Sequence, residues 1–139
     1  MVGDGEHLPR YKAQVGRHAL EDRVHFMKSM PARQAFSLAR LVVVPSRAEA
    51  MPYIVLEALA AGKPMIATAV GGIPEIFGPG SAAIVRPDSG ELATRMAEAL
   101  TNPPAFLEHM PDTRELKARF GVATMASEIE KAYFVALAR

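Results

Sequence analysis

The stretch VVVPSRAEAMPYIVLEALAAGKPMIATAVGGIPEI, residues 42–76, gives the clearest indication of the fold of this chain. It holds an apolar run that ends before Pro45, a second apolar segment from Pro52 to Ala61, and a third from Met65 to Thr68. An apolar run without polar alternation is typical of a parallel strand that is covered on both faces. A longer segment that begins with proline and is followed by Gly62 is typical of a helix. The order strand, helix, strand predicts a parallel α/β unit.

The same alternation continues on both sides of this stretch. Short apolar runs predict strands at Val24–Phe26, Leu41–Val44, Met65–Thr68 and Ala82–Val85. Helical patterns occupy roughly Leu8–His18, Ala32–Ala39, Pro52–Ala61, Ser89–Leu100 and Ala123–Leu137. Connections of this length allow right-handed crossovers between parallel strands. The sequence therefore predicts an α/β domain over residues 1–139, with a parallel sheet flanked by helices.

Composition excludes several classes of function. The formal net charge of +1 and the lack of any long run of like charges disfavour a nucleic-acid groove. The absence of cysteine excludes disulfides and thiolate chemistry. No apolar run approaches the roughly 20 residues of a membrane span. The four histidines lack the spacing with a nearby carboxylate that marks a zinc helix, so no metal site is predicted.

Two glutamates separated by seven residues, Glu49 and Glu57, lie where a loop meets the helix that begins near Pro52. The start of a helix presents unpaired N–H groups and a partial positive charge, which suit a phosphate. An ionised Glu57 in the second turn could accept hydrogen bonds from two sugar hydroxyls, so the arrangement suits a nucleotide-sugar. Because the helix is apolar nearly all round, we expect it to be buried. The spacing fits equally well a buried Glu57 held by Arg or Lys, with Glu49 as a solvated loop residue.

Residues 42–76 resemble the donor-binding half of retaining glycosyltransferases with the two-domain GT-B architecture, specifically family 4. The features that agree in order are an apolar strand ending in Pro45-Ser46, the glutamate pair, the Ala-Gly-Lys-Pro turn at 61–64, a second strand, and the loop VGGIPEI at 70–76. Outside this stretch, Gly3-Asp4-Gly5, the segment 20–26 and Phe120-Gly121 are also similar to the family. The resemblance therefore covers almost the whole chain and implies a Rossmann-like domain.

The resemblance implies roles for individual residues. Glu57 would accept hydrogen bonds from the ribose hydroxyls of the donor, and Glu49 would face the transferred sugar as the catalytic residue. The other donor-binding residues that it implies are Met51, Pro52, Tyr53, Ile54, Gly3, Lys28 and Gly72. The nucleotide-diphosphate sugar would be the substrate, and neither a cofactor nor a metal is expected. Backbone amides and the helix dipole would stabilise the diphosphate leaving group.

The chain departs from the commoner family pattern Glu-Gly-Phe-Gly, since it reads Glu49-Ala50-Met51-Pro52. Proline cannot donate a hydrogen bond from its backbone nitrogen, so phosphate binding would fall to the amides of Tyr53 and Ile54. Lys28 stands where the family often has glycine, near the expected position of the base. Gly71-Gly72 fits either a ligand-binding loop or a tight turn.

The resemblance also implies parts that this chain lacks, namely an N-terminal acceptor domain and the first strand of the donor domain. We therefore expect a fragment, truncated at its N-terminal side, that has no activity alone. The absent strand would lie centrally in the sheet and leave open hydrogen-bonding edges, through which copies of the chain could associate. We expect a cytoplasmic protein, and leave open a peripheral association of the longer parent protein with a membrane.

The function that the sequence predicts is donor binding in an enzyme that transfers a hexose from a nucleotide-diphosphate sugar to a saccharide or lipid acceptor. Two alternatives remain at this point. One is a non-catalytic, GT-B-like interaction module whose departures at Ala50, Pro52 and Lys28 have abolished ligand binding. The other is an epimerase or phosphorylase of the same architecture.

Overall fold

The computed structural model describes residues 1–138 and divides into two compact units, unit 1 (Met1–Leu38) and unit 2 (Ala39–Arg139). Unit 1 contains helices α1 (Leu8–Arg17) and α2 (Ala32–Ser37). The predicted strand Val24–Phe26 is wrong, because this region makes only one isolated parallel bridge, between Val2 and Met27. A lone parallel pair has no covering layers to stabilise it, so the pairing does not extend into a strand. The expectation of one domain stays a prediction.

Unit 2 is built on a parallel three-stranded sheet in the order β1-β2-β3. Its strands are β1 (Val42–Val44), β2 (Met65–Thr68) and β3 (Ile84–Val85), with Val43 opposite Ile66 and Ala67 opposite Ile84. Every residue of the central strand β2 is buried. The predicted strand at 82–85 is shortened, because Ser81 accepts hydrogen bonds from the amides of Ala83 and Ile84 and so keeps this segment in a turn.

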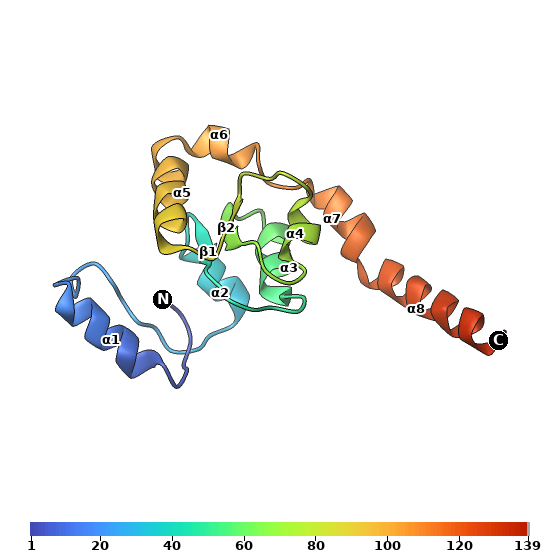
Figure 1. The fold of residues 1–139 in the computed structure, drawn as a ribbon, viewed down its shortest axis with the longest axis horizontal. Coiled ribbons are helices and arrows are strands. Elements are labelled where there is room, and N and C mark those ends of the chain that lie inside the picture. The colour runs from blue at the N-terminus through green and yellow to red at the C-terminus, as the bar shows by residue number, and fades with distance from the viewer. Residues whose placement is uncertain (139) are drawn as a thin grey trace. The chain divides into compact units, whose positions relative to one another are not determined.

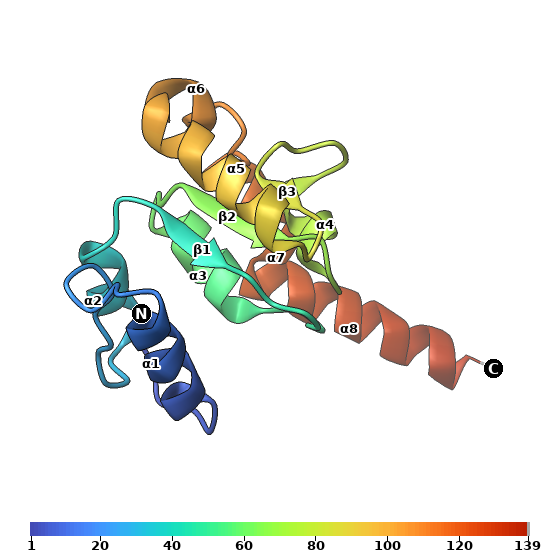
Figure 2. The ribbon, with the colours of Figure 1, turned by 60° about the vertical axis from the view of Figure 1, so that its left-hand side comes forward.

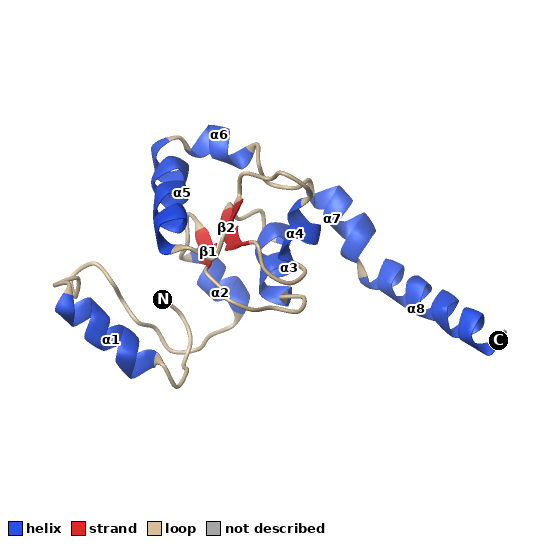
Figure 3. Ribbon diagram, viewed as in Figure 1, coloured by secondary structure: helices blue, strands red, loops and turns tan. Residues whose placement is uncertain are grey.

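Helices cover both faces of this sheet. In Figure 1 and Figure 2, the sheet lies between α5 (Ser89–Thr101) on one side and α3 (Tyr53–Ala60) on the other. Figure 3 shows that the chain consists mostly of helices and loops, with the strands short and central in unit 2. The remaining helices are α4 (Ile73–Phe77), α6 (Pro103–Leu107), α7 (Thr113–Phe120) and α8 (Val122–Leu137). The predicted parallel sheet flanked by helices is confirmed, whereas α6 and α7 were absent from the predicted elements.

The core of unit 2 lies around β2. Its largest fully buried side chains are those of Met65, Ile66, Ile73, Ile76, Val55 and Thr68. By contrast, α8 has no buried residue, and large apolar side chains on it, such as Ile129 and Phe134, are exposed. The core of unit 2 therefore comes from β2, α3 and α4, next to the loop of residues 45–52 that carries Glu49, here called the glutamate loop.

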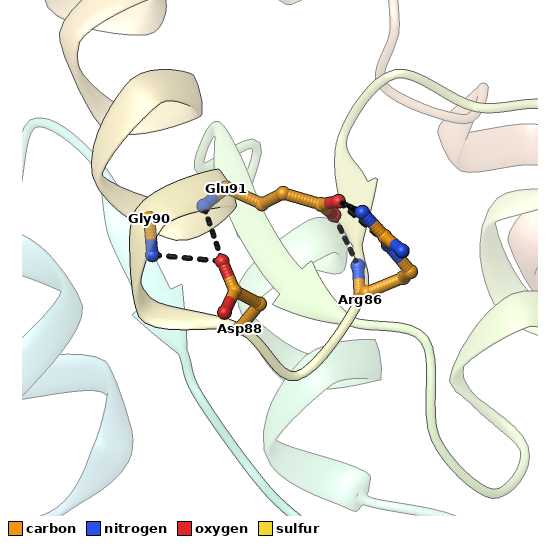
Figure 4. Close-up of polar contacts among 4 residues, drawn as sticks. All are labelled: Arg86, Asp88, Gly90 and Glu91. Carbon is orange, nitrogen blue, oxygen red and sulfur yellow. Dashed lines mark hydrogen bonds and ion pairs between the residues drawn. The ribbon is translucent and has the colours of Figure 1, made fainter.

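The junction between β3 and α5 is fixed by polar contacts, which Figure 4 shows. The Asp88 carboxylate accepts hydrogen bonds from the amides of Gly90 and Glu91, both at 2.9 Å, and so caps α5. The Arg86 guanidinium pairs with the Glu91 carboxylate, and its Nε lies 2.6 Å from Glu91 Oε1. The hydrogen bond from Arg86 lowers the pKa of the Glu91 carboxyl and raises the pKa of Arg86. These contacts fix the path of the chain at the carboxyl end of β3.

Replacing Asp88 with alanine is expected to lower the free energy of unfolding by about 1 kcal/mol, because two amides at the start of α5 lose their acceptor. Urea denaturation followed by circular dichroism measures this loss. Asp112 caps α7 in the same way, so Asp112→Ala is the matched comparison. An unchanged midpoint for Asp88→Ala would show that the cap does not contribute to stability.

Candidate functional site

Helix α3 begins one residue later and ends one residue earlier than the predicted segment Pro52–Ala61. Pro52 is the N-cap, with an extended backbone (φ −77°, ψ 106°), so it is not the first helical residue as predicted. Gly62 has φ +68°. Its amide bonds to Leu59 O at 2.9 Å, and the amide of Lys63 bonds to Ala58 O at 3.0 Å. These two bonds form a Schellman motif, which confirms the predicted glycine end of the helix.

The expectation that α3 is buried is wrong. Only Val55, Ala58 and Leu59 are buried, because a single face of the helix packs on the unit 2 core. Tyr53, Glu57 and Ala60 are exposed, and their spacing places them on one outward face. The alternative of a buried Glu57 held by a basic partner is therefore also wrong. No ion pair of Glu57 occurs within residues 1–138. Its carboxylate is accessible to a ligand.

Glu49 is half-buried and ordered by a hydroxyl group. The Ser46 hydroxyl donates a hydrogen bond of 2.5 Å to Glu49 Oε1. The carbonyl of Ser46 in turn accepts a hydrogen bond of 2.5 Å from the hydroxyl of Thr68, which ends β2 and is 2% exposed. The alternative of Glu49 as a solvated loop residue is therefore wrong. The loop after β1 is tied to the end of the buried central strand.

Gly71 and Gly72 support the same loop from its other side. The Gly72 amide donates a hydrogen bond of 2.8 Å to the carbonyl of Ala50. Gly71 has φ +54°, and a Cβ placed on it would lie 1.9 Å from the Glu49 carbonyl oxygen. A Cβ on Gly72 would lie 2.9 Å from Met51 Cε. Both glycines allow a close approach of the backbone, so the segment forms a tight turn packed against the glutamate loop, and ligand contact by Gly72 stays a prediction.

The start of α3 is open to a ligand. No side chain caps it, and Val55 is the first residue whose amide bonds back, to Pro52 O at 3.0 Å. Within the described chain, the amides of Tyr53 and Ile54 donate no hydrogen bond. Met51 and Ile54 are 38% and 39% exposed, whereas Pro52 is buried. The two free amides are therefore the unpaired donors that this helix start offers to a ligand.

Gly3 and Lys28, the remaining predicted donor residues, belong to unit 1. The Gly3 amide donates to the carbonyl of Met27 at 3.1 Å, and the Asp4 carboxylate accepts from the Ser29 amide at 2.9 Å. The structure thus brings Gly3 next to the segment that carries the exposed Lys28. Because the Gly3 amide is already bonded, it is not free to bind phosphate.

Two cavities in unit 2 lie next to the predicted residues. A small one of about 160 Å³ lies at the carboxyl ends of the strands, where ligands bind in open α/β sheets, and is lined in part by Arg47, Thr68 and Asp88. Another, of about 460 Å³, is lined by Met51, Tyr53 and apolar residues of α8. A larger cavity of about 880 Å³ beside β3 includes none of the predicted residues, and Arg86 and Arg95 on its wall are already paired with glutamates.

Sequence reasoning missed Ser46 and Thr68 as site residues. Thr68 is the single polar residue of an otherwise apolar strand and stands at its carboxyl end, which was the available signal. Among residues 1–138, no cluster of acidic and histidine side chains is able to hold a metal ion. Within the same range, no helix combines the length and apolarity needed to cross a membrane.

Known proteins are similar in sequence to most of this chain. Alpha-D-kanosaminyltransferase of Streptomyces kanamyceticus is 32% identical over 76% of this chain and 32% of its own length. The phosphatidylinositol N-acetylglucosaminyltransferase gpi3 subunit of Schizosaccharomyces pombe is 26% identical over 96% of this chain and 30% of its own length. The chain thus spans about a third of the length of these relatives.

The solved structures that resemble this chain point to the same class of protein as the relatives found by sequence. The structure of Anabaena HepE in complex with UDP-glucose matches 96% of this chain and 40% of that chain, with a TM-score of 0.82 and 25% identity. Sucrose-phosphate synthase from Thermosynechococcus elongatus matches 96% of this chain and 35% of that chain, with a TM-score of 0.81 and 29% identity. The family described as "Glycosyl transferases group 1" matches residues 1–102. The resemblance to glycosyltransferases is confirmed, and the chain belongs to the group 1 glycosyl transferase family.

Proposed function

We propose that this chain is the donor-binding part of a retaining, family 4 glycosyltransferase of GT-B architecture. The enzyme would transfer a hexose from a nucleotide-diphosphate sugar to a saccharide or lipid acceptor. The observation that carries the proposal is the combination at one end of α3 of an ordered Glu49, two free amides and an exposed Glu57. The complex of the similar Anabaena protein with UDP-glucose supports a nucleotide-sugar as the ligand.

Each of these groups has a distinct part in the proposed site. The ionised Glu57 accepts hydrogen bonds from ribose hydroxyls, which a carboxylate does without donating any. The amides of Tyr53 and Ile54 and the positive end of α3 bind the diphosphate and stabilise the charge that develops on it as it leaves. Glu49 faces the transferred sugar, and Met51 and Gly72 border it. The proposed reaction uses no metal ion.

We propose that acceptor binding and full activity require a chain as long as these relatives. The name of the similar phosphatidylinositol N-acetylglucosaminyltransferase supports a lipid acceptor, whereas the name of the kanosaminyltransferase gives only the group that is transferred. We propose that residues 1–139 bind donor but give no turnover alone. A cytoplasmic location and self-association through the edge strands β1 and β3 are further parts of the proposal.

The test is a ligand-observed NMR panel of UDP, GDP, ADP and their common sugar derivatives. One nucleotide is expected to bind, and Glu57→Ala is expected to weaken it about tenfold to a hundredfold, the effect of losing one or two hydrogen bonds to a charged acceptor. Glu130→Ala, which removes an exposed glutamate from α8, is the matched control and should bind as the parent chain does. Equal affinity of the parent chain and Glu57→Ala would contradict the assigned role of Glu57.

A non-catalytic interaction module is the second candidate, and the exposed apolar side chains of α8 favour it. It predicts that a chain with a cooperative unfolding transition binds no member of the nucleotide panel. An epimerase or phosphorylase is less well supported, because the similar proteins named above include transferases of two different sugars.

A further inference from the structure

A line of hydrogen bonds connects the central strand to Glu49. The Thr68 hydroxyl lies 2.5 Å from the carbonyl oxygen of Ser46 and 3.4 Å from that of Val44, and the Ser46 hydroxyl lies 2.5 Å from Glu49 Oε1. A carbonyl oxygen and an ionised carboxylate only accept, so both hydroxyls must act as donors. The direction of every bond in this line is therefore fixed, from Thr68 to Ser46 and from Ser46 to Glu49.

Thr68, the first donor in this line of hydrogen bonds, is held rigidly by the core. Thr68 is 2% exposed, and all the other residues of β2 are buried as well. A buried hydroxyl that loses its acceptor is unfavourable, so Thr68 resists any movement of the Ser46 backbone. At the opposite side of the loop, the close approach of Gly71 to the Glu49 carbonyl limits movement of the backbone there. Both sides of the loop are held by groups that belong to the core or pack against it.

The line of hydrogen bonds ends at the Glu49 side chain, whose position it restricts. A free glutamate side chain samples many rotamers, and fixing it costs conformational entropy. The Ser46 hydroxyl selects one position for Glu49 Oε1, and the second carboxylate oxygen carries no hydrogen bond within residues 1–138. A carboxylate that is ordered in advance binds a sugar hydroxyl without meeting that cost on binding.

We propose that Ser46 and Thr68 are positioning residues, which orient the Glu49 carboxylate toward the sugar of the donor before the donor binds. This inference rests on the proposed function, since it concerns the sugar end of the same ligand. It predicts a selective effect, because Glu57 and the α3 amides hold the nucleotide end of the ligand. Loss of the Ser46 hydroxyl weakens binding of the nucleotide-sugar and leaves binding of the nucleoside diphosphate unchanged.

The experiment compares the affinities for UDP and UDP-glucose, or for the GDP or ADP pair if the nucleotide panel selects that base. Ser46→Ala is expected to weaken UDP-glucose about threefold to tenfold, the scale of a single hydrogen bond, with no change for UDP. Glu49→Ala should show the same selective loss. The double variant should bind UDP-glucose no more weakly than Glu49→Ala alone, since both changes remove one interaction.

Thr68 is tested by a pair of substitutions. Thr68→Val removes the hydroxyl at nearly constant shape and is expected to lower UDP-glucose affinity, whereas Thr68→Ser keeps the hydroxyl and should restore it. Urea denaturation of each variant separates this effect from a general loss of folding. Equal loss of UDP and UDP-glucose affinity in Ser46→Ala, or additive losses in the double variant, would overturn the inference while leaving the donor site intact. A folded parent chain that binds no nucleotide would overturn the proposed function, and this inference with it.

Discussion

Gly71→Ala is expected to lower the free energy of unfolding by about 3 kcal/mol, from the left-handed backbone and the overpacking together. It is also expected to abolish nucleotide-sugar binding. Gly71 has φ +54°, a conformation that a residue with a Cβ adopts at a cost. The added carbon would lie 1.9 Å from the Glu49 carbonyl oxygen, so the backbone of the glutamate loop must move. Chemical denaturation and UDP-glucose titration measure the two effects.

Gly62→Ala separates the two causes. Gly62 also has a positive φ, +68°, but nothing lies within 4 Å of a Cβ built on it. This variant carries the backbone cost alone, about 1 kcal/mol, and should keep its affinity for the donor. If both variants lost the same stability and both retained binding, the contact between Gly71 and the glutamate loop would not contribute to donor binding.

Ile66→Ala is expected to lower the free energy of unfolding by about 3–4 kcal/mol, because it removes a fully buried side chain from the central strand and leaves a cavity. The measurement is the urea midpoint at an unchanged m-value, which reports stability rather than a change of the denatured state. Ile129→Ala is the matched control, since Ile129 on α8 is 50% exposed and should cost well under half as much. A comparable loss for Ile129→Ala would show that the apolar face of α8 is covered in solution.

Local sequence patterns predicted the paired strands of unit 2 and the glycine end of α3. The apolar runs at 42–44 and 65–68 became paired parallel strands, the first partly buried and the second fully buried. Gly62 ended α3 because only the left-handed conformation completes a Schellman motif. Val24–Phe26 looked similar in sequence but lacks neighbouring strands in unit 1. The difference lies in tertiary context, which a short apolar run does not contain.

The roles of the site residues stay predictions, whereas the burial of the helix that carries Glu57 was predicted wrongly. The apolar composition of α3 gave the wrong burial for the helix, because apolar residues such as Ile54 also occupy its exposed side. The link from Thr68 to Ser46 joins residues 22 positions apart in the chain. Such a contact depends on how β1 and β2 are aligned, so no local pattern contains it.

The contact between Gly72 and Ala50 has a consequence for how this site can diversify. That contact joins two backbone groups, the Gly72 amide and the Ala50 carbonyl, while the Ala50 side chain is exposed. Residue 50 can therefore change in identity while the path of the glutamate loop is preserved. Position 50 is a suitable first target for a saturation library aimed at altering the choice of the proposed donor without redesigning the scaffold.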